Sequence, residues 1–268
     1  MATVQDLLNI LNDIAADDLA ETWDNVGLLI GSPDHRITSV LLALDPTVEL
    51  IDQAQNYGAE LVITHHPAIF HPLKSLRTDQ PVGNFIHSAL QAGISVIGCH
   101  TNLDSTLGGV SDVLAQTLGL VKTEPLVADK NCNEACGLGR IGNLETAITP
   151  DTFITGMYNA LSPPWLLEAG PRPELVSRVA VCGGSCSDLS ETALQAGADV
   201  FITAEVKHAT ARWAEEAGLW LIDGGHFATE NPAMPALQQL LTHKLKQADM
   251  AVQIYSARQD PPLKLITI

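Results

Sequence analysis

Asn56-Tyr-Gly-Ala-Glu-Leu-Val-Ile-Thr64 is a short apolar run preceded by glycine, and it recurs as Gln195-Ala-Gly-Ala-Asp-Val-Phe-Ile-Thr203. The offset between the two stretches is 139 residues, and it stays constant back to Val40 and Val179, where another apolar run begins in each half. Short apolar runs bounded by turn residues are typical of strands that are buried on both faces of a sheet. The repeated stretch therefore predicts a βαβ unit that is present twice.

Segments with helical spacing of apolar residues lie between and after the predicted strands. They are Thr47–Tyr57, Val82–Gln91, Thr149–Leu161, Ser187–Gln195, His208–Ala217 and Met234–Gln247. Strands that alternate with helices favour an α/β fold with parallel sheets. We therefore predict two similar, interlocked α/β lobes from an internal duplication, with largely parallel sheets flanked by helices.

The predicted lobes divide the chain near its middle. The first α/β lobe is expected at 1–122, and a connector with the second α/β lobe at 123–268. The connector, from about 122 to 178, is rich in Pro, Gly and charge, so we expect a loop-heavy bridge with a strand or two. A strand is predicted at Met250–Ser256 without an assigned place in either sheet, and the C-terminal segment can pack back on the first lobe.

Imidazole and carboxylate side chains follow three of the predicted strands. The segments are Ile63-Thr-His-His-Pro67, Gly98-Cys-His-Thr-Asn-Leu-Asp104 and Asp223-Gly-Gly-His-Phe-Ala-Thr-Glu230. In an open α/β sheet, ligands bind where loops converge at the carboxyl ends of strands. The three motifs therefore predict one shared metal site. Mixed imidazole and carboxylate ligands suit zinc, iron, manganese or nickel, and adjacent histidines with a bridging carboxylate can hold two such ions.

Three further residues lie close to these motifs. His100 is interpreted as a metal ligand, a partner that supports a ligand, or a proton shuttle, and the sequence leaves these alternatives open. Glu205 and His208 occupy the place in the second half that the histidine pair occupies in the first. They are expected either to line the opposite wall as a base or substrate contacts, or to form an exposed helix start. We name His100 and Glu205 as candidate catalytic residues.

Composition limits the classes of partner. The formal net charge is −17 and the basic residues form no run, so nucleic acid is not expected as a partner. The sequence has no apolar stretch long enough for a membrane span, so no membrane association is expected. The N-terminal segment predicts an amphipathic helix without the basic start of a signal peptide. Five cysteines form no disulfide-scaffold pattern, and together these features favour a cytoplasmic protein.

Taken jointly, the motifs resemble those of the Nif-three-like family, often labelled GTP cyclohydrolase 1 type 2 homologue, along nearly the whole chain. The matching segments include Trp23-Asp-Asn-Val-Gly-Leu28, Ile202-Thr-Ala-Glu-Val-Lys-His208 and the three metal motifs above. The resemblance implies a dinuclear divalent-metal centre and a toroidal homohexamer with the metals facing an internal cavity. The ligands that it implies are His65, His66, Asp104, His226 and Glu230. Ala204 replaces the glycine expected before Glu205, which leaves the role of that segment open.

Two functions of different kinds fit these features. The first is a metal-dependent hydrolase acting on a nucleotide-like or other small polar substrate, with His100 or Glu205 moving protons. The second is a non-catalytic metal-binding, metal-delivery or scaffold protein. A nucleic-acid-linked regulator is disfavoured by the negative charge.

Overall fold

The structure is a computed structural model that describes residues 2–129, 132 and 136–266. The chain forms two compact units. The first comprises the chain up to Thr106 together with Met234–Gln259, and the second comprises Leu107–Ala233 and the chain from Asp260 onward. The sequence analysis placed residues 107–122 with the first lobe. The structure places them with the second, because α5 (Val110–Thr117) packs against strands β7, β8 and β10 of that unit.

The first unit is a five-stranded sheet with helices on both sides among the residues that the structure describes. Its strands pair in the order β13-β4-β5-β6-β2, and all pairs are parallel except β6 with β2. The sheet strands are β2 (Gly27–Ile30), β4 (Ser39–Ala43), β5 (Leu61–Thr64), β6 (Ser95–Gly98) and β13 (Gln253–Ser256). A small separate ladder joins β1 (Ala2–Thr3) to β3 (Arg36–Ile37). β13 pairs with β4, so the strand predicted at Met250–Ser256 belongs to the sheet of the first unit.

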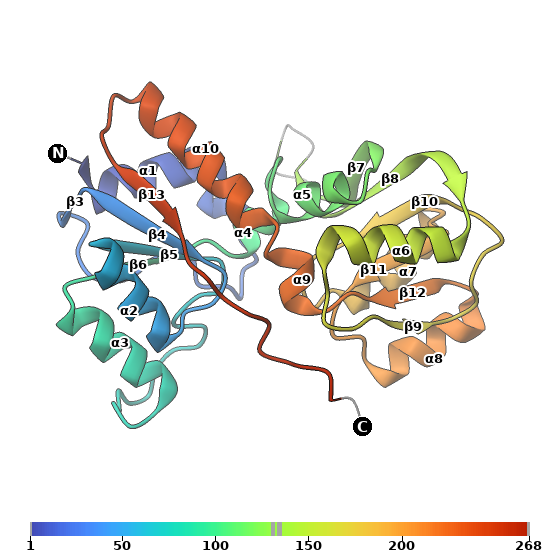
Figure 1. Cartoon of the computed structure of the whole chain (residues 1–268), viewed down its shortest axis with the longest axis horizontal. Helices are drawn as coiled ribbons and strands as arrows, with labels where there is room; N and C mark the ends of the chain where they lie inside the picture. The colour runs from blue at the N-terminus through green and yellow to red at the C-terminus, as the bar shows by residue number, and fades with distance from the viewer. Residues whose placement is uncertain (1, 130–131, 133–135, 267–268) are drawn as a thin grey trace. The chain divides into compact units, whose positions relative to one another are not determined.

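Helices cover the two faces of this sheet (Figure 1). They are α1 (Val4–Ile14), α2 (Val48–Tyr57), α3 (Pro81–Gln91), the short α4 (Thr101–Ser105) and α10 (Ala233–Gln247), with a 3-10 turn, η1, at Asp17–Leu19. Leu50 on α2 and Phe85 on α3 pack with Leu41, Val62 and Val96 of the sheet in one buried cluster. Figure 1 shows α1 and α10 on the opposite side. The strands are therefore covered on both faces, as their uninterrupted apolar sequences predict.

The second unit is a six-stranded mixed sheet among the described residues. Its order is β7-β8-β10-β11-β12-β9, and only β10 with β11 and β11 with β12 are parallel. The strands are β7 (Val121–Ala128), β8 (Gly137–Ile148), β9 (Leu167–Ala169), β10 (Val176–Val181), β11 (Val200–Thr203) and β12 (Trp220–Asp223). The prediction of largely parallel sheets thus describes the first unit well and only the centre of the second.

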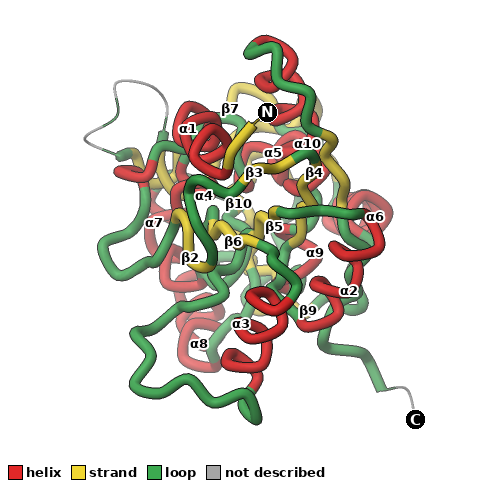
Figure 2. Tube along the Cα trace, turned by 90° about the vertical axis from the view of Figure 1, so that its left-hand side faces the viewer, coloured by secondary structure: helices red, strands yellow, loops and turns green. Residues whose placement is uncertain are grey.

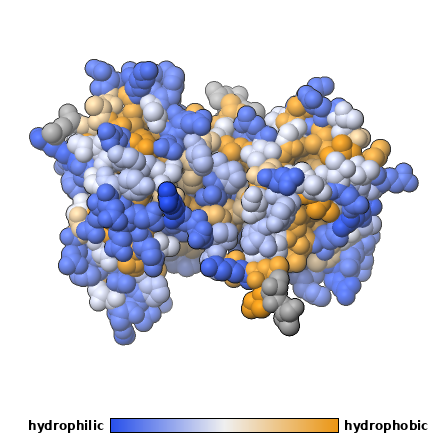
Figure 3. Space-filling model, viewed as in Figure 1, coloured by the Kyte–Doolittle hydropathy of each residue, from blue (hydrophilic) through white to orange (hydrophobic). Residues whose placement is uncertain are grey.

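Side chains alternate between two buried clusters along the central strands of the second unit. Val200 and Ile202 face α5 and α6 (Pro150–Leu161), while Phe201 between them faces the other side. That other side is covered by α7 (Ser190–Gln195), which follows the 3-10 turn η2 (Ser187–Leu189), and by α8 (His208–Ala217). The last helix, α9 (His226–Glu230), follows β12. Figure 3 shows hydrophobic residues gathered on the visible face of this unit and a mainly hydrophilic surface on the first.

The repeated stretches occupy corresponding places in the two units. β5 and β11 are the middle members of parallel triplets, β4-β5-β6 in the first unit and β10-β11-β12 in the second. Each triplet ends in a short helix, α4 after β6 and α9 after β12. These short helices carry Asp104 and Glu230, each four residues after a histidine, His100 or His226. The origin of this similarity in a duplication stays a prediction.

The connector is more regular than expected, because β7 and β8 form a long antiparallel pair within 121–148. Pro125 interrupts the strand pattern of β7, but β7 lies at the edge of the sheet, where a missing backbone donor is tolerated. Cys132 and Cys136, which the sequence gave no reason to pair, form a disulfide. Among the described residues, none of the helices combines the length and apolar character needed to cross a membrane.

Candidate metal centre

His65 and His66 directly follow β5 and remain attached to the neighbouring strand. The His65 backbone N–H donates to Ala43 O at 3.1 Å, and that of His66 donates to Leu44 O at 2.9 Å. Their ring centroids lie 5.0 Å apart with the ring planes at 50°. The adjacent imidazoles therefore diverge only modestly, as the turn at Pro67 predicts, and both remain at the carboxyl edge of the sheet.

His100 joins this pair from the end of the next strand. Ring nitrogens of His65, His66 and His100 all lie within 4.8 Å of one another, a spacing at which they could hold a metal ion. Asp104, one helical turn further on in α4, places its Oδ1 3.6 Å from His65 Nε2. The structure thus brings four of the sequence-predicted residues together within the first unit. We call the three histidines the imidazole triad.

Each histidine of the triad has its Nδ1 hydrogen-bonded to an oxygen of the protein. His65 Nδ1 lies 3.0 Å from the Cys99 carbonyl oxygen, and His66 Nδ1 lies 2.7 Å from Asp45 Oδ1. His100 Nδ1 lies 2.9 Å from Asp24 Oδ1. A carbonyl or carboxylate oxygen can only accept, so these contacts place a proton on Nδ1, and in the neutral imidazole the lone pair is then on Nε2. Histidines that bind metals through Nε2 are oriented in this way.

Asp24 is held as an anion beneath His100. Burial alone would raise the pKa of its carboxyl, but hydrogen bonds from His100 and Thr101 outweigh that effect and lower the pKa far below its usual range. Thr101 donates to Asp24 Oδ2 through both its backbone N–H, at 3.0 Å, and its hydroxyl, at 2.6 Å. The fixed carboxylate keeps His100 in one tautomer and one orientation.

The second unit carries a similar arrangement around His226, the first residue of α9. His226 Nδ1 lies 2.9 Å from Glu205 Oε1, and its Nε2 lies 3.0 Å from Glu230 Oε2, one helical turn away. Glu230 is almost fully buried, with 3% of its surface exposed. Glu205, proposed from the sequence as a catalytic residue, therefore contacts Nδ1 of the candidate ligand His226, on the opposite side of the ring from Glu230. Glu205 has a positive φ of 54°, which fixes the turn after β11.

Two glycines make room for the Glu230 carboxylate. A Cβ atom on Gly184 would lie 2.1 Å from Glu230 Oε1 and 3.2 Å from His226 Nε2, and one on Gly183 would lie 3.2 Å from Glu230 Cγ. The Gly184 backbone N–H donates to Thr229 Oγ1 at 3.1 Å. The Gly183-Gly184 turn thus packs directly against α9 and leaves room for the Glu230 carboxylate.

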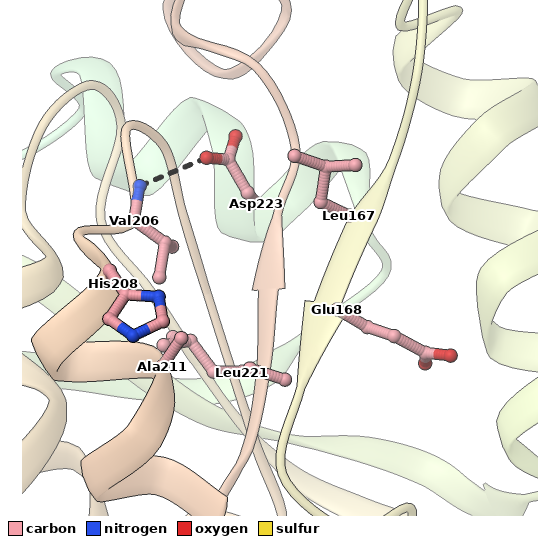
Figure 4. Close-up of a pocket in the computed structure, with 8 residues that line it drawn as sticks. Leu167, Glu168, Val206, His208, Ala211, Leu221 and Asp223 are labelled. Carbon is pink, nitrogen blue, oxygen red and sulfur yellow. Dashed lines mark hydrogen bonds between the residues drawn. The ribbon is translucent and has the colours of Figure 1, made fainter.

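His208 lies apart from these ligands, in a pocket of about 430 Å³ within the second unit. Figure 4 shows its imidazole near Ala211 and Leu221, with Asp223 and Leu167 on the far side. Asp223 accepts a hydrogen bond from the Val206 backbone N–H at 3.0 Å and so ties β12 to the turn that carries Glu205. His208 is thus the exposed first residue of α8 and also lines this pocket.

Cysteine is a weak candidate for coordination in this region. Cys99 lies between β6 and His100, but burial, together with nearby Asp17 and Asp104, raises the pKa of its thiol to about 12. The thiol therefore stays protonated at neutral pH, whereas metals bind the thiolate. The Cys99 carbonyl, through its hydrogen bond with His65, is the part of this residue that supports the site.

Residues that support the histidines were less visible in the sequence than the histidines themselves. Asp24 lies in the Trp23–Leu28 segment, which belongs to the family resemblance, and it orients His100. Asp45 was not among the predicted site residues, although it contacts His66. Like His66, Asp45 is a polar residue directly after a buried apolar run, and this feature could have identified it.

We predict that Asp45→Ala and Glu205→Ala weaken metal binding by roughly ten- to a hundredfold, because each removes the oxygen that orients a candidate ligand. Competition with a chromophoric zinc chelator measures the change. Asp188→Ala, which removes an exposed carboxylate paired only with Lys207, is the matched control and should leave the affinity unchanged. Equal affinities in all four proteins would show that the two carboxylates support no ligand.

Comparison with known proteins agrees with this description. A model of the family described as Duf34/NIF3 (NGG1p interacting factor 3) matches residues 2–262. A relative from Clostridium perfringens, named GTP cyclohydrolase 1 type 2 homolog, is 34% identical over 96% of this chain and 98% of its own. A relative of the same name from Lactococcus lactis is 33% identical over 90% and 91% of the two chains.

Solved structures show the same fold. The crystal structure of Staphylococcus aureus protein SA1388 has a TM-score of 0.92 at 27% identity, covering 99% of both chains. That of a Bacillus cereus protein related to NIF3 has a TM-score of 0.94 at 23% identity, again over 99% of both chains, and supports the fold alone. The predicted α/β class with helix-flanked sheets is confirmed. On the family match over nearly its whole length, the chain belongs to the Duf34/NIF3 family.

Proposed function

We propose that the chain binds two divalent metal ions through His65, His66, Asp104, His226 and Glu230 and hydrolyses a small, polar, nucleotide-like substrate with them. The observation that carries the proposal is that His65, His66 and His226 are all oriented by a hydrogen bond at Nδ1. In each of them a backbone or carboxylate oxygen engages Nδ1 and orients the ring, and Nε2 of His65 and of His226 lies beside a candidate carboxylate ligand, Asp104 or Glu230.

The ligand chemistry fits such ions. Imidazole nitrogens with two carboxylates, Asp104 beside His65 and Glu230 beside His226, form the mixed set that suits zinc, iron, manganese or nickel. The close carboxylate contacts would otherwise surround a neutral imidazole lone pair with negative charge, which a cation relieves. Two bound divalent ions would supply Lewis-acid polarisation and a water of lowered pKa.

His100 is the residue best placed to move a proton. Its Nδ1 is fixed by Asp24, and its ring lies 5.1 Å from that of His65 and 5.6 Å from that of His66, centroid to centroid. The hydrogen bond between Nδ1 and Asp24 holds the ring in one orientation, so Nε2 can accept a proton and return it without the ring reorienting. Glu205 acts as a positioning residue for His226 in this account.

Turnover tests the enzymatic part of the proposal. Chelator-stripped protein is reloaded separately with zinc, manganese, iron(II) or nickel and incubated with nucleoside mono-, di- and triphosphates, and chromatography measures phosphate release and ring opening. We expect metal-dependent turnover that falls about a hundred- to ten-thousandfold in His100→Ala, the usual range for loss of a general acid or base. The His100→Ala protein should still bind metal.

The same experiment distinguishes the hydrolase from the alternative function, a non-catalytic metal-delivery protein. If fully loaded wild-type protein is inactive on the whole panel and passes its metal rapidly to an apo-acceptor protein, the chain is a metal-delivery protein and the hydrolase proposal is wrong. Metal-dependent turnover that His100→Ala leaves unchanged would retain the hydrolase and remove His100 from its chemistry.

A further inference from the structure

Two exposed aromatic side chains stand beside the imidazole triad within the first unit. Trp23 and Phe70 are 57% and 41% exposed, although both are large and mainly apolar. Their ring centroids are 5.8 Å apart. Each also lies 6.2 Å from the His100 ring, in nearly perpendicular edge contacts. We call this pair the aromatic lip.

The lip is built from two loops that hydrogen bonds fasten together. Trp23 precedes Asp24, which binds His100 and Thr101, so the position of the tryptophan is tied to the start of α4. Asn25 donates its side-chain amide to the Ile69 carbonyl at 2.5 Å and thereby links this turn to the residue before Phe70. Both rings are therefore held in place before any partner arrives, which reduces the entropy lost on binding.

The loop that carries Phe70 also differs from an ordinary connection. Between β5 and α3 the chain from Pro67 to Gln80 contains no helix or strand (Figure 2). Connections of this length without secondary structure are uncommon in compact domains and usually serve a binding site. Leu73 and Leu76 in the same loop are also exposed.

We propose that Trp23 and Phe70 stack against a flat aromatic heterocycle of about purine size, whose polar substituents reach the imidazole triad. The proposal rests on the proposed function, since it identifies the ring of the substrate that the same site would use. Aromatic side chains bind bases through their faces without requiring positive charge. This mode of recognition suits a chain whose net charge is −17.

The contact of both rings with His100 favours this occupant over a second copy of the chain. A ring placed on the lip lies next to the residue that we assign to proton movement, so the stacking energy also positions the reacting group. A surface that served only self-association would have no need of this contact with the triad. The exposed Leu73 and Leu76 keep self-association as the competing outcome of the test.

Binding of guanosine 5′-monophosphate and ribose 5-phosphate to full-length protein, measured by calorimetry with and without bound zinc, tests the lip. Trp23→Ala is expected to weaken binding of the nucleotide by roughly five- to a hundredfold, the usual effect of losing one stacking partner, and Trp23→Phe to retain most of the affinity. Ribose 5-phosphate has no aromatic ring to stack, so it should bind equally to all variants. Tyr158→Ala removes an equally exposed aromatic residue on α6 and should change nothing.

Light scattering on the same samples gives the oligomeric state. Equal nucleotide affinity in wild type and Trp23→Ala overturns the proposal, and a loss of self-association in that variant would identify a second copy as the occupant. Elemental analysis of the zinc content shows whether the proposal for the lip fails or the proposal for the metal site fails. Protein with two zinc ions and no Trp23 effect contradicts the lip alone, whereas a Trp23 effect in protein that cannot take up zinc contradicts the proposed function alone.

Discussion

Asp104→Ala is expected to leave a folded protein that binds at least one of its two metal ions about a hundred- to a thousandfold more weakly. The estimate follows because the ~10–16 kcal/mol of a protein zinc site is shared among about four ligands. Asp104 Oδ1 lies 3.6 Å from His65 Nε2, and the side chain is mostly buried. The variant therefore loses the anion that neutralises the ion at this histidine.

Chelator competition at neutral pH measures this change, with circular dichroism to verify the fold. Asp104→Asn retains the size and one oxygen acceptor of the side chain but not its charge, so its affinity should fall between those of wild type and the alanine variant. Wild-type metal affinity in a folded Asp104→Ala protein would remove this residue from the ligand set.

Gly184→Ala is expected to damage both the stability of the second unit and its share of the metal site. The new methyl group would lie 2.1 Å from Glu230 Oε1, and the residue has a φ of +66°, which disfavours any side chain. Left-handed backbone costs about 1–2 kcal/mol and overpacking about 1–3 kcal/mol more, so unfolding free energy should fall by about 2–5 kcal/mol. The displaced carboxylate should also weaken metal binding.

Gly218→Ala is the matched control for this substitution. Gly218 ends α8 with a φ of +82°, but a Cβ there would meet nothing within 4 Å. The control therefore pays only the backbone cost of about 1–2 kcal/mol and should bind metal normally. Denaturant unfolding and zinc titration of both variants give the comparison. If the two alanines have the same effects, the Gly-Gly turn does not serve to seat Glu230.

The central strands and most helices were predictable from the sequence because their apolar patterns are local. α8 begins at His208 and ends at Ala217 as predicted, and α2 differs by one residue at its start. Glycines with positive φ, such as Gly58 and Gly218, end these helices and make their boundaries visible. Burial on both faces then gives the strands continuous apolar sequences.

The connector was expected to contain a strand or two, but the β7–β8 pair could not be located within it because its pattern is not local. β8 contains Gly137, Gly139 and Gly142, and a Cβ on any of them would come within 3 Å of a neighbouring atom. Close approach between strands, and not a turn, accounts for these glycines. The sequence does not distinguish the two, so the expected strands of the connector were given no bounds. The boundary near Thr106 was missed for a related reason, since the packing of α5 is a tertiary contact.

The candidate ligands were predictable because each follows a recognisable strand, whereas their supporting carboxylates were not. His65 and His66 are fixed by β5, but the acceptor of His66, Asp45, comes from a strand 21 residues earlier. Asp24 reaches His100 from 76 residues away. Such partners depend on which strands become neighbours, and a single sequence does not specify that in advance. The same holds for the lip, since nothing in the sequence pairs Trp23 with Phe70.

Anomalous X-ray scattering from crystals of the zinc-loaded protein tests the metal site most directly. We predict two anomalous peaks per chain, about 3.5–4 Å apart, the separation usual in two-metal sites. They should be contacted by Nε2 of His65, His66 and His226 and by the carboxylates of Asp104 and Glu230. Loaded crystals without peaks at these residues, or with zinc bound only elsewhere on the chain, would contradict the account.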